Sequence, residues 1–384
     1  MIAALPFASR RLLVCIGPGG VGKTTLAAAI ALREARAGRK VLVCTIDPAR
    51  RLANSLGLEQ LSGRETEVSL AGLGLVAPAP VPATRLETPG RLFAMMLDLR
   101  RSWDELIDRT AKSPEQRDRI YRNALYQHLA GALAGSQEYA AVAQLAQLAQ
   151  DRDYDLIVLD TPPTVQALDF LEAPTRILDF LDNGAARLLL APAAMAGKVS
   201  LRILSLGSGV IMKSLSRLTG LELLRQLAEF MLELSGMYDA FKAKAAEVKR
   251  LLGSAETGFV LITSPQPGAV DEALAFAEIL RRGALPLRAV VANRVNPMPK
   301  LGLRESPEAL LQILEQLPGE LAGRLRTAVE DAESLATRDA RELERLPRVL
   351  RIPRLEREVF DLDALVEVGD LLASAASSEK LSVA

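Results

Sequence analysis

The sequence of 384 residues predicts an α/β fold with a mainly parallel, doubly wound sheet and a helical insertion subdomain. The first observation is a set of short apolar, β-branched runs that end in polar residues, the pattern of strands buried on both faces of a parallel sheet. These runs occupy residues 10–17, 40–47, 154–161, 257–264 and 287–294. The second observation is that helical patterns separate the runs. The first of them, at residues 23–37, opens a βαβ unit with an expected right-handed crossover.

Two long stretches fall outside this alternation. Residues 90–150 and 184–252 have mostly helical patterns and each lies between predicted strands, so we expect two insertions that pack together into one subdomain. The core then consists of residues 1–89, 151–183 and 253–375. The Pro-rich segment 74–85 cannot be a central strand and is predicted to connect into the first insertion. The small, polar residues 376–384 are predicted to form a flexible tail.

Composition excludes several classes of protein. Lys plus Arg and Asp plus Glu both number 47, and no run of like charge dominates, which argues against a nucleic-acid or anionic-membrane surface. Two cysteines inside apolar runs are too few for a disulfide framework and indicate a reducing compartment. Charges or prolines interrupt every apolar stretch before it reaches bilayer length. We therefore expect a soluble, cytoplasmic protein without stable membrane insertion.

The segment after the first predicted strand carries a phosphate-binding motif. Gly17, Gly22, Lys23 and Thr24 match G-x-x-x-x-G-K-[ST]. In this motif the glycines let backbone N–H groups approach phosphate oxygens, the lysine neutralises them, and the threonine hydroxyl ligates Mg²⁺. The strand before it and the helix after it are the expected context, because a helix N-terminus favours anions. A P-loop nucleoside triphosphatase is predicted; the alternative is a glycine-rich turn without a ligand.

Two carboxylates follow neighbouring predicted strands. Asp47 would face the γ-phosphate from the carboxyl end of the sheet, where it could orient water or take its proton. Alternatively, Asp47 only caps the turn before Pro48. Asp160 ends an apolar run, as carboxylates do that serve the Mg²⁺ shell of P-loop proteins. Residues 161–164 would then form a switch loop.

Four motifs, GGVGKTT, TIDPARRLANSLG, DTPPT and VVANR, together resemble the ArsA-like ATPases. This family contains arsenite-pump ATPases and the ATPases that target tail-anchored membrane proteins. The resemblance covers most of the chain, and residues 126–139 and 352–369 are similar to the bacterial branch. It implies a dimeric switch that binds and hydrolyses ATP with Mg²⁺.

The resemblance also implies roles for individual residues. The phosphate loop would comprise Gly19, Gly20, Val21, Gly22, Lys23, Thr24 and Thr25. Lys23 and Asp47 would be the catalytic groups, with Asp47 positioning water, and Thr24 and Asp160 would hold the metal. Asn293 would read the adenine, and the backbone near Pro353 would form a wall for the base. From the residues alone, Asn293 could equally cap the turn after its strand.

Pro18 departs from the pattern of the resembled family, in which a lysine at this place contacts phosphate across the dimer interface. A homodimer would lack that charge in both sites. Arg50 or Arg51 could supply a charge within the same chain, although ordinary surface charge is the alternative for both. The other remedy is a heterodimer with a lysine-containing ArsA-like paralogue.

The second insertion carries a broad apolar face at helical spacing. Its members are Leu223, Leu224, Leu227, Phe230, Met231, Leu234, Met237, Tyr238 and Phe241, with Met212 just before it. The face could form a groove for a hydrophobic helical client, or it could pack inside the protein. Arsenite or zinc binding is not expected, because the thiolate clusters are missing and His128 is interpreted as a packed helix residue.

The leading functional interpretation is a nucleotide switch that handles hydrophobic protein segments. The alternative is a regulatory or scaffolding subunit that binds ATP, hydrolyses it weakly and acts through a paralogous partner. A partitioning ATPase is disfavoured by the balanced charge and the large insertions.

Overall fold

The computed structural model describes residues 9–46, 51–74, 90–97, 111–123, 136–150, 153–161, 238–300 and 306–378, with positions 5, 7, 104, 105 and 107–109. The chain divides into two compact units. The first unit comprises residues 1–96, 152–164 and 253–384, and the second comprises residues 97–151 and 165–252.

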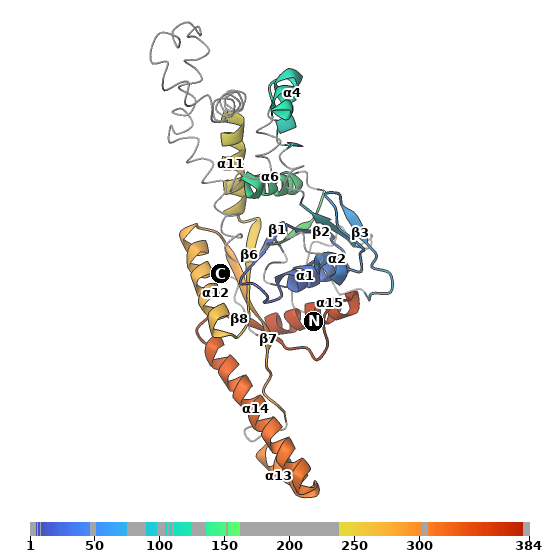
Figure 1. Cartoon of the computed structure of the whole chain (residues 1–384), viewed down its shortest axis with the longest axis vertical. Coiled ribbons are helices and arrows are strands. Elements are labelled where there is room, and N and C mark those ends of the chain that lie inside the picture. Colours follow the sequence, from blue (N-terminus) through green and yellow to red (C-terminus); the bar gives the residue numbers. More distant parts are fainter. Residues whose placement is uncertain are drawn as a thin grey trace, which may run out of the picture. The chain divides into compact units, whose positions relative to one another are not determined.

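The first unit contains an eight-stranded sheet (Figure 1). Its strands are β1 (Leu12–Ile16), β2 (Lys40–Thr45), β3 (Thr66–Val68), β4 (Arg91–Met96), β5 (Leu156–Asp160), β6 (Thr257–Thr263), β7 (Leu287–Val295) and β8 (Val349–Pro353). Their spatial order is β3-β4-β2-β5-β1-β6-β7-β8. Every neighbouring pair is parallel except β3 with β4. The predicted α/β fold with a mainly parallel sheet is confirmed.

The strands that the sequence predicts are the central ones, β1, β2, β5, β6 and β7. The strands at the two edges, β3, β4 and β8, were not predicted. Residues 91–96 therefore belong to the sheet, and the expectation that a helical insertion starts at residue 90 is wrong at that end. The sequence RLFAMM lacks β-branched residues, so its local pattern does not favour a strand; parallel pairing with β2 determines its conformation.

The described residues of the first unit also form helices. They are α1 (Lys23–Arg36), α2 (Arg51–Ser55), α12 (Pro267–Arg282), α13 (Pro307–Gln316), α14 (Gly319–Leu343) and α15 (Leu362–Ser378). Helices α1 and α15 lie side by side and share one apolar cluster with alternate residues of β1, β2, β5, β6, β7 and β8 (Figure 1). Helix α12 packs against β6 and β7. Because α15 continues to Ser378, the predicted flexible tail starts too early at residue 376.

The described part of the second unit is helical. It includes α4 (Pro114–Arg122), α6 (Ser136–Gln150) and α11 (Tyr238–Leu252), and α6 packs against α11. Ser113 caps α4 by accepting a hydrogen bond from the Gln116 N–H. The predicted apolar face at 223–241 and His128 lie outside the residues whose side chains are described. Within the described residues, no helix combines the length and apolarity needed to cross a bilayer.

A buried carboxylate anchors the chain where it leaves β7. Asp339 on α14 is fully buried, and its Oδ2 accepts hydrogen bonds from the backbone N–H of Asn296 at 3.0 Å and from the Asn296 side-chain amide at 2.7 Å. The Arg338 guanidinium lies 3.2 Å from the other carboxylate oxygen. A buried charge is stable only when it is paired and hydrogen-bonded in this way. Helix α14 therefore fixes the segment that follows β7.

Replacing Asp339 with alanine is expected to lower the free energy of unfolding by about 2 kcal/mol, because it leaves two partly buried donors of Asn296 without their acceptor. Urea denaturation measures this change. Asp331→Ala, at an exposed position of the same helix, is the matched control and should be near neutral. Equal stability of the two variants would contradict the anchoring role.

Candidate functional site

The loop between β1 and α1 has a backbone that only glycine adopts easily. Gly17, Gly20 and Gly22 have φ angles of 147°, 76° and 95°. A Cβ atom on Gly17 would lie 1.9 Å from the Ile262 carbonyl oxygen of β6, so the loop lies directly on that neighbouring strand. A Cβ atom on Gly22 would lie 2.4 Å from the Asn293 amide nitrogen. The motif glycines therefore satisfy both a backbone and a packing requirement.

Side chains from two elements hold the loop carbonyls. The Lys23 ammonium, buried at the start of α1, donates to the Gly17 and Pro18 carbonyl oxygens at 2.9 and 2.8 Å. From β7, the Asn293 amide donates to the Val21 carbonyl oxygen at 2.9 Å. The Arg294 guanidinium donates to the Gly20 carbonyl oxygen at 3.1 Å. Lys23 is thus placed at the loop, where the motif predicts it.

Oxygen atoms suited to a divalent cation meet beside the loop. The Thr24 hydroxyl donates to Oδ2 of Asp160 at 2.7 Å, and the Thr45 hydroxyl lies 3.3 Å from the same oxygen. Asp160 is buried at the carboxyl end of β5, directly beside β1 in the sheet. Hydroxyl and carboxylate oxygens are the ligands that Mg²⁺ prefers. This donor set and the glycine cradle fit a magnesium–phosphate group.

A pocket of about 310 Å³ opens over the loop. Its lining consists of Gly20, Gly22, Lys23, Thr24, Thr25, Arg51, Asn54, Ser55, Thr161, Arg294, Val359 and Phe360. Three of these side chains are cations and none is a carboxylate, so the described lining favours an anionic ligand. The exposed Phe360 and its neighbour Val359 are the apolar residues of this lining.

The structure brings most of the predicted site residues together. Gly20, Gly22, Lys23, Thr24 and Thr25 line the pocket, Asp160 contacts Thr24, and Asn293 contacts the loop at Val21. Pro353 pairs with Val295 at the end of β8 and is not part of the lining. Asp47 and Arg50 lie outside the described residues.

The sequence analysis missed several residues of this site, among them Arg294 and Phe360, and left the role of Arg51 open. Arg51 lines the pocket. It is one of the two arginines suggested as a substitute for the lysine that is absent at position 18. Arg294 and Phe360 were not predicted. The signal for Arg294 was its place directly after Asn293, at the carboxyl end of a central strand; Phe360 has no comparable local signal.

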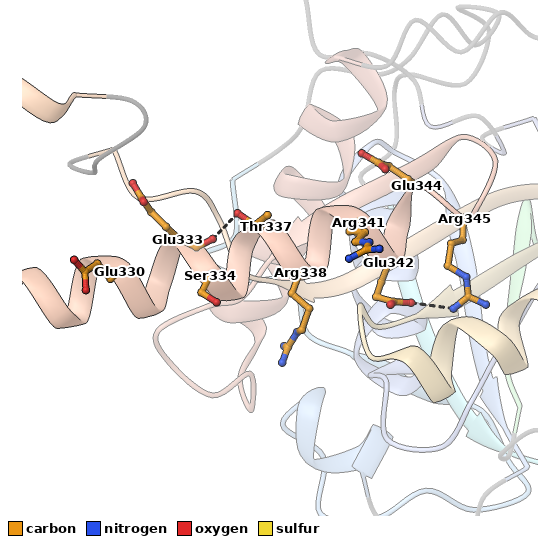
Figure 2. Close-up of a pocket in the computed structure, with 9 residues that line it drawn as sticks. All are labelled: Glu330, Glu333, Ser334, Thr337, Arg338, Arg341, Glu342, Glu344 and Arg345. Atoms are coloured by element: carbon orange, nitrogen blue, oxygen red, sulfur yellow. Dashed lines mark hydrogen bonds and ion pairs between the residues drawn. The ribbon is translucent and has the colours of Figure 1, made fainter.

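A larger hollow, about 1000 Å³, lies along the carboxyl-terminal part of α14 and is distinct from the glycine loop. Figure 2 shows its lining, which is dominated by glutamate and arginine side chains of this one helix and the residues just after it. Several of these pair with each other, as Glu342 does with Arg345 at 2.9 Å. Because these charges neutralise one another at an open surface, the smaller pocket at the loop is the better candidate for chemistry.

Neither cysteine is suited to metal or redox chemistry. Cys15 and Cys44 are fully buried on β1 and β2, with β5 between them. Burial raises the pKa of both thiols above the usual range, and the Asp160 carboxylate adds to the rise at Cys15. Thiolates, the form that binds soft metals, are therefore disfavoured at both positions.

The family model described as anion-transporting ATPase matches residues 10–302, a stretch that contains the glycine loop, Asp160 and Asn293. The chain belongs to the anion-transporting ATPase family. The ArsA-like resemblance predicted from the sequence motifs is thereby confirmed.

Three curated relatives place this family member in context. It is 31% identical over 167 residues to ATPase GET3 of Malassezia globosa, covering 44% of the chain and 43% of the relative. It is 29% identical over 287 residues to uncharacterized protein SCO2128 of Streptomyces coelicolor, covering 75% and 63%. It is 30% identical over 197 residues to a putative arsenical pump-driving ATPase of Halobacterium salinarum, covering 49% and 28%. The chain thus spans less than two thirds of the length of these relatives.

Alanine at Gly17 is expected to be more destabilising than alanine at Gly20. Both positions have positive φ, which costs a residue with a side chain about 1 kcal/mol. Only Gly17 also lacks space, because its Cβ would meet the Ile262 carbonyl, whereas nothing lies within 4 Å of a Cβ at Gly20. Thermal unfolding of the two variants measures the difference. Similar melting temperatures would show that the loop does not depend on its contact with β6.

Proposed function

We propose that this protein binds and hydrolyses Mg-ATP and acts as a dimeric nucleotide switch. The observation that carries the proposal is the three-glycine loop with Lys23 at its base and the Thr24–Asp160 pair beside it. These groups match the requirements of a triphosphate with its metal: backbone amides, a cation, and oxygen ligands. The family membership supports the same reading.

Different residues of the site would bind phosphate, hold the metal ion and position the attacking water. Lys23 would exchange its loop carbonyls for phosphate oxygens, and Thr24 and Asp160 would hold Mg²⁺, which neutralises developing negative charge during phosphoryl transfer. Asp47, two positions after the last residue of β2, would orient the attacking water. The family resemblance implies adenine contacts for Asn293 and for the backbone near Pro353. Hydrolysis would switch the helical unit that handles hydrophobic segments.

The charge missing at Pro18 favours one form of the dimer. The Pro18 carbonyl oxygen accepts a hydrogen bond from Lys23. Proline restricts φ and has no donor, so it adds no positive charge to the site. A heterodimer with a lysine-containing paralogue would supply this charge from the partner. The same observation supports the second candidate function, a regulatory subunit with weak hydrolysis of its own.

Asp47→Asn and Lys23→Ala separate hydrolysis from binding. Asp47→Asn should leave Mg-ATP affinity near that of the wild type and lower the hydrolysis rate by about two orders of magnitude, because it removes water positioning but no phosphate contact. Lys23→Ala should weaken binding itself. Calorimetric titration and phosphate release measure the two quantities. Hydrolysis at the wild-type rate by Asp47→Asn would refute the assignment.

The dimer proposal predicts that the chain alone hydrolyses ATP slowly. Addition of a co-purifying lysine-containing paralogue should raise the rate by about a thousandfold or more, as a cation donated between subunits does. The gain should vanish when that lysine of the paralogue is changed to alanine. Full activity of the chain alone, lost in Arg51→Ala, would instead place the compensating charge within the same chain.

A further inference from the structure

Two consecutive residues of β7 hold two consecutive carbonyl groups of the phosphate loop. The Asn293 amide donates to the Val21 carbonyl oxygen, and the Arg294 guanidinium donates to the Gly20 carbonyl oxygen, at 2.9 and 3.1 Å. Oδ1 of Asn293 in turn accepts from the backbone N–H of Arg294 at 3.0 Å. These contacts join segments more than 270 positions apart in the sequence.

Three other loop carbonyls, those of Gly17, Pro18 and Gly22, accept hydrogen bonds from α1. Lys23 donates to Gly17 and Pro18, and the backbone N–H of Leu26 donates to the Gly22 carbonyl oxygen at 3.0 Å. Buried or crowded carbonyls need such donors. Because the C=O and N–H of a peptide unit point in opposite directions, hydrogen bonds that fix the loop carbonyls also fix the orientation of the loop N–H groups. The two β7 residues therefore complete a set of contacts that α1 alone does not provide.

The backbone conformation and the surroundings of Arg294 indicate a role at the loop. Its φ of 61° lies in the left-handed region, which is costly for a residue with a side chain. Among the residues that the structure describes, no carboxylate forms an ion pair with Arg294, although its side chain is exposed. Its partner Asn293 fits only because Gly22 has no Cβ, which would lie 2.4 Å from the amide nitrogen.

We propose that Asn293 and Arg294 are positioning residues that brace the phosphate loop from β7 and so preorganise its N–H groups for phosphate oxygens. The inference rests on the proposed function for the ligand, a nucleoside triphosphate, but the brace itself is a property of the chain without ligand. It assigns the Asn293 amide to the Val21 carbonyl of the loop, in place of the adenine contact that the family resemblance implies for it. Asp339 extends the brace, because it anchors the segment after β7 through Asn296.

The first test follows hydrogen exchange of the loop amides in the chain without nucleotide. Arg294→Ala and Asn293→Ala should each raise the exchange rate of a peptide covering residues 17–25 about fivefold, the effect of losing one hydrogen bond, with little change in melting temperature. Arg294→Lys should restore most of the protection, because lysine can still donate to the Gly20 carbonyl. Arg351→Ala, at an exposed position on β8, is the control and should leave exchange unchanged. Unchanged exchange in both alanine variants overturns the brace.

The second test compares the affinities of the same variants for Mg-ATP, Mg-GTP and tripolyphosphate. A brace acts on the phosphate loop, so the alanine variants should lose about fivefold in affinity for all three, with an unchanged ATP to GTP ratio. A change in that ratio with normal loop exchange would overturn the brace and favour adenine reading by Asn293. If the wild-type chain binds none of the three, the proposed function is wrong, whereas faster loop exchange in the variants would still support the brace.

Discussion

The structure of the site depends on the hydrogen bonds made by the backbone carbonyls of residues 17–22, which connect the buried strand β1 to the buried helix α1. A carbonyl of such a turn that is shielded from water must find a donor, because an unpaired buried polar group costs as much as a lost hydrogen bond. Lys23, Asn293 and Arg294 supply donors from α1 and β7. The loop conformation therefore depends on donors from α1 and β7, and the glycines make that conformation sterically possible.

Sheet order explains why these elements meet. Because β1 lies between β5 and β6, with β7 next, the carboxyl ends of four parallel strands surround the loop. Asp160 pairs in register with Cys15 and so reaches Thr24, while Ile262 of β6 lies under Gly17. Ligand sites in open α/β sheets form at such carboxyl ends. Burial of α1 beneath α15 then keeps the helix start, and with it Lys23, in place.

Much of this arrangement could be predicted from local patterns. The central strands are buried on both faces and so consist of continuous apolar runs, and the glycine motif requires a specific strand-to-helix turn. The edge strands were missed because their conformation is set by pairing: β3 has three residues, and β4 has no β-branched residue. The contacts of Arg294 with the loop could not be predicted, since they depend on tertiary register and on a left-handed backbone at a residue other than glycine.

The central claim is that the glycine loop, Lys23 and the Thr24–Asp160 pair form one nucleotide site in each chain. Calorimetric titration of the intact protein with ATP, in the presence of Mg²⁺ and again in the presence of a chelator, tests it most directly. The account predicts saturable binding of one nucleotide per chain that is competed by ADP and is weaker without Mg²⁺. Absence of binding at millimolar ATP, or binding indifferent to Mg²⁺, would contradict it.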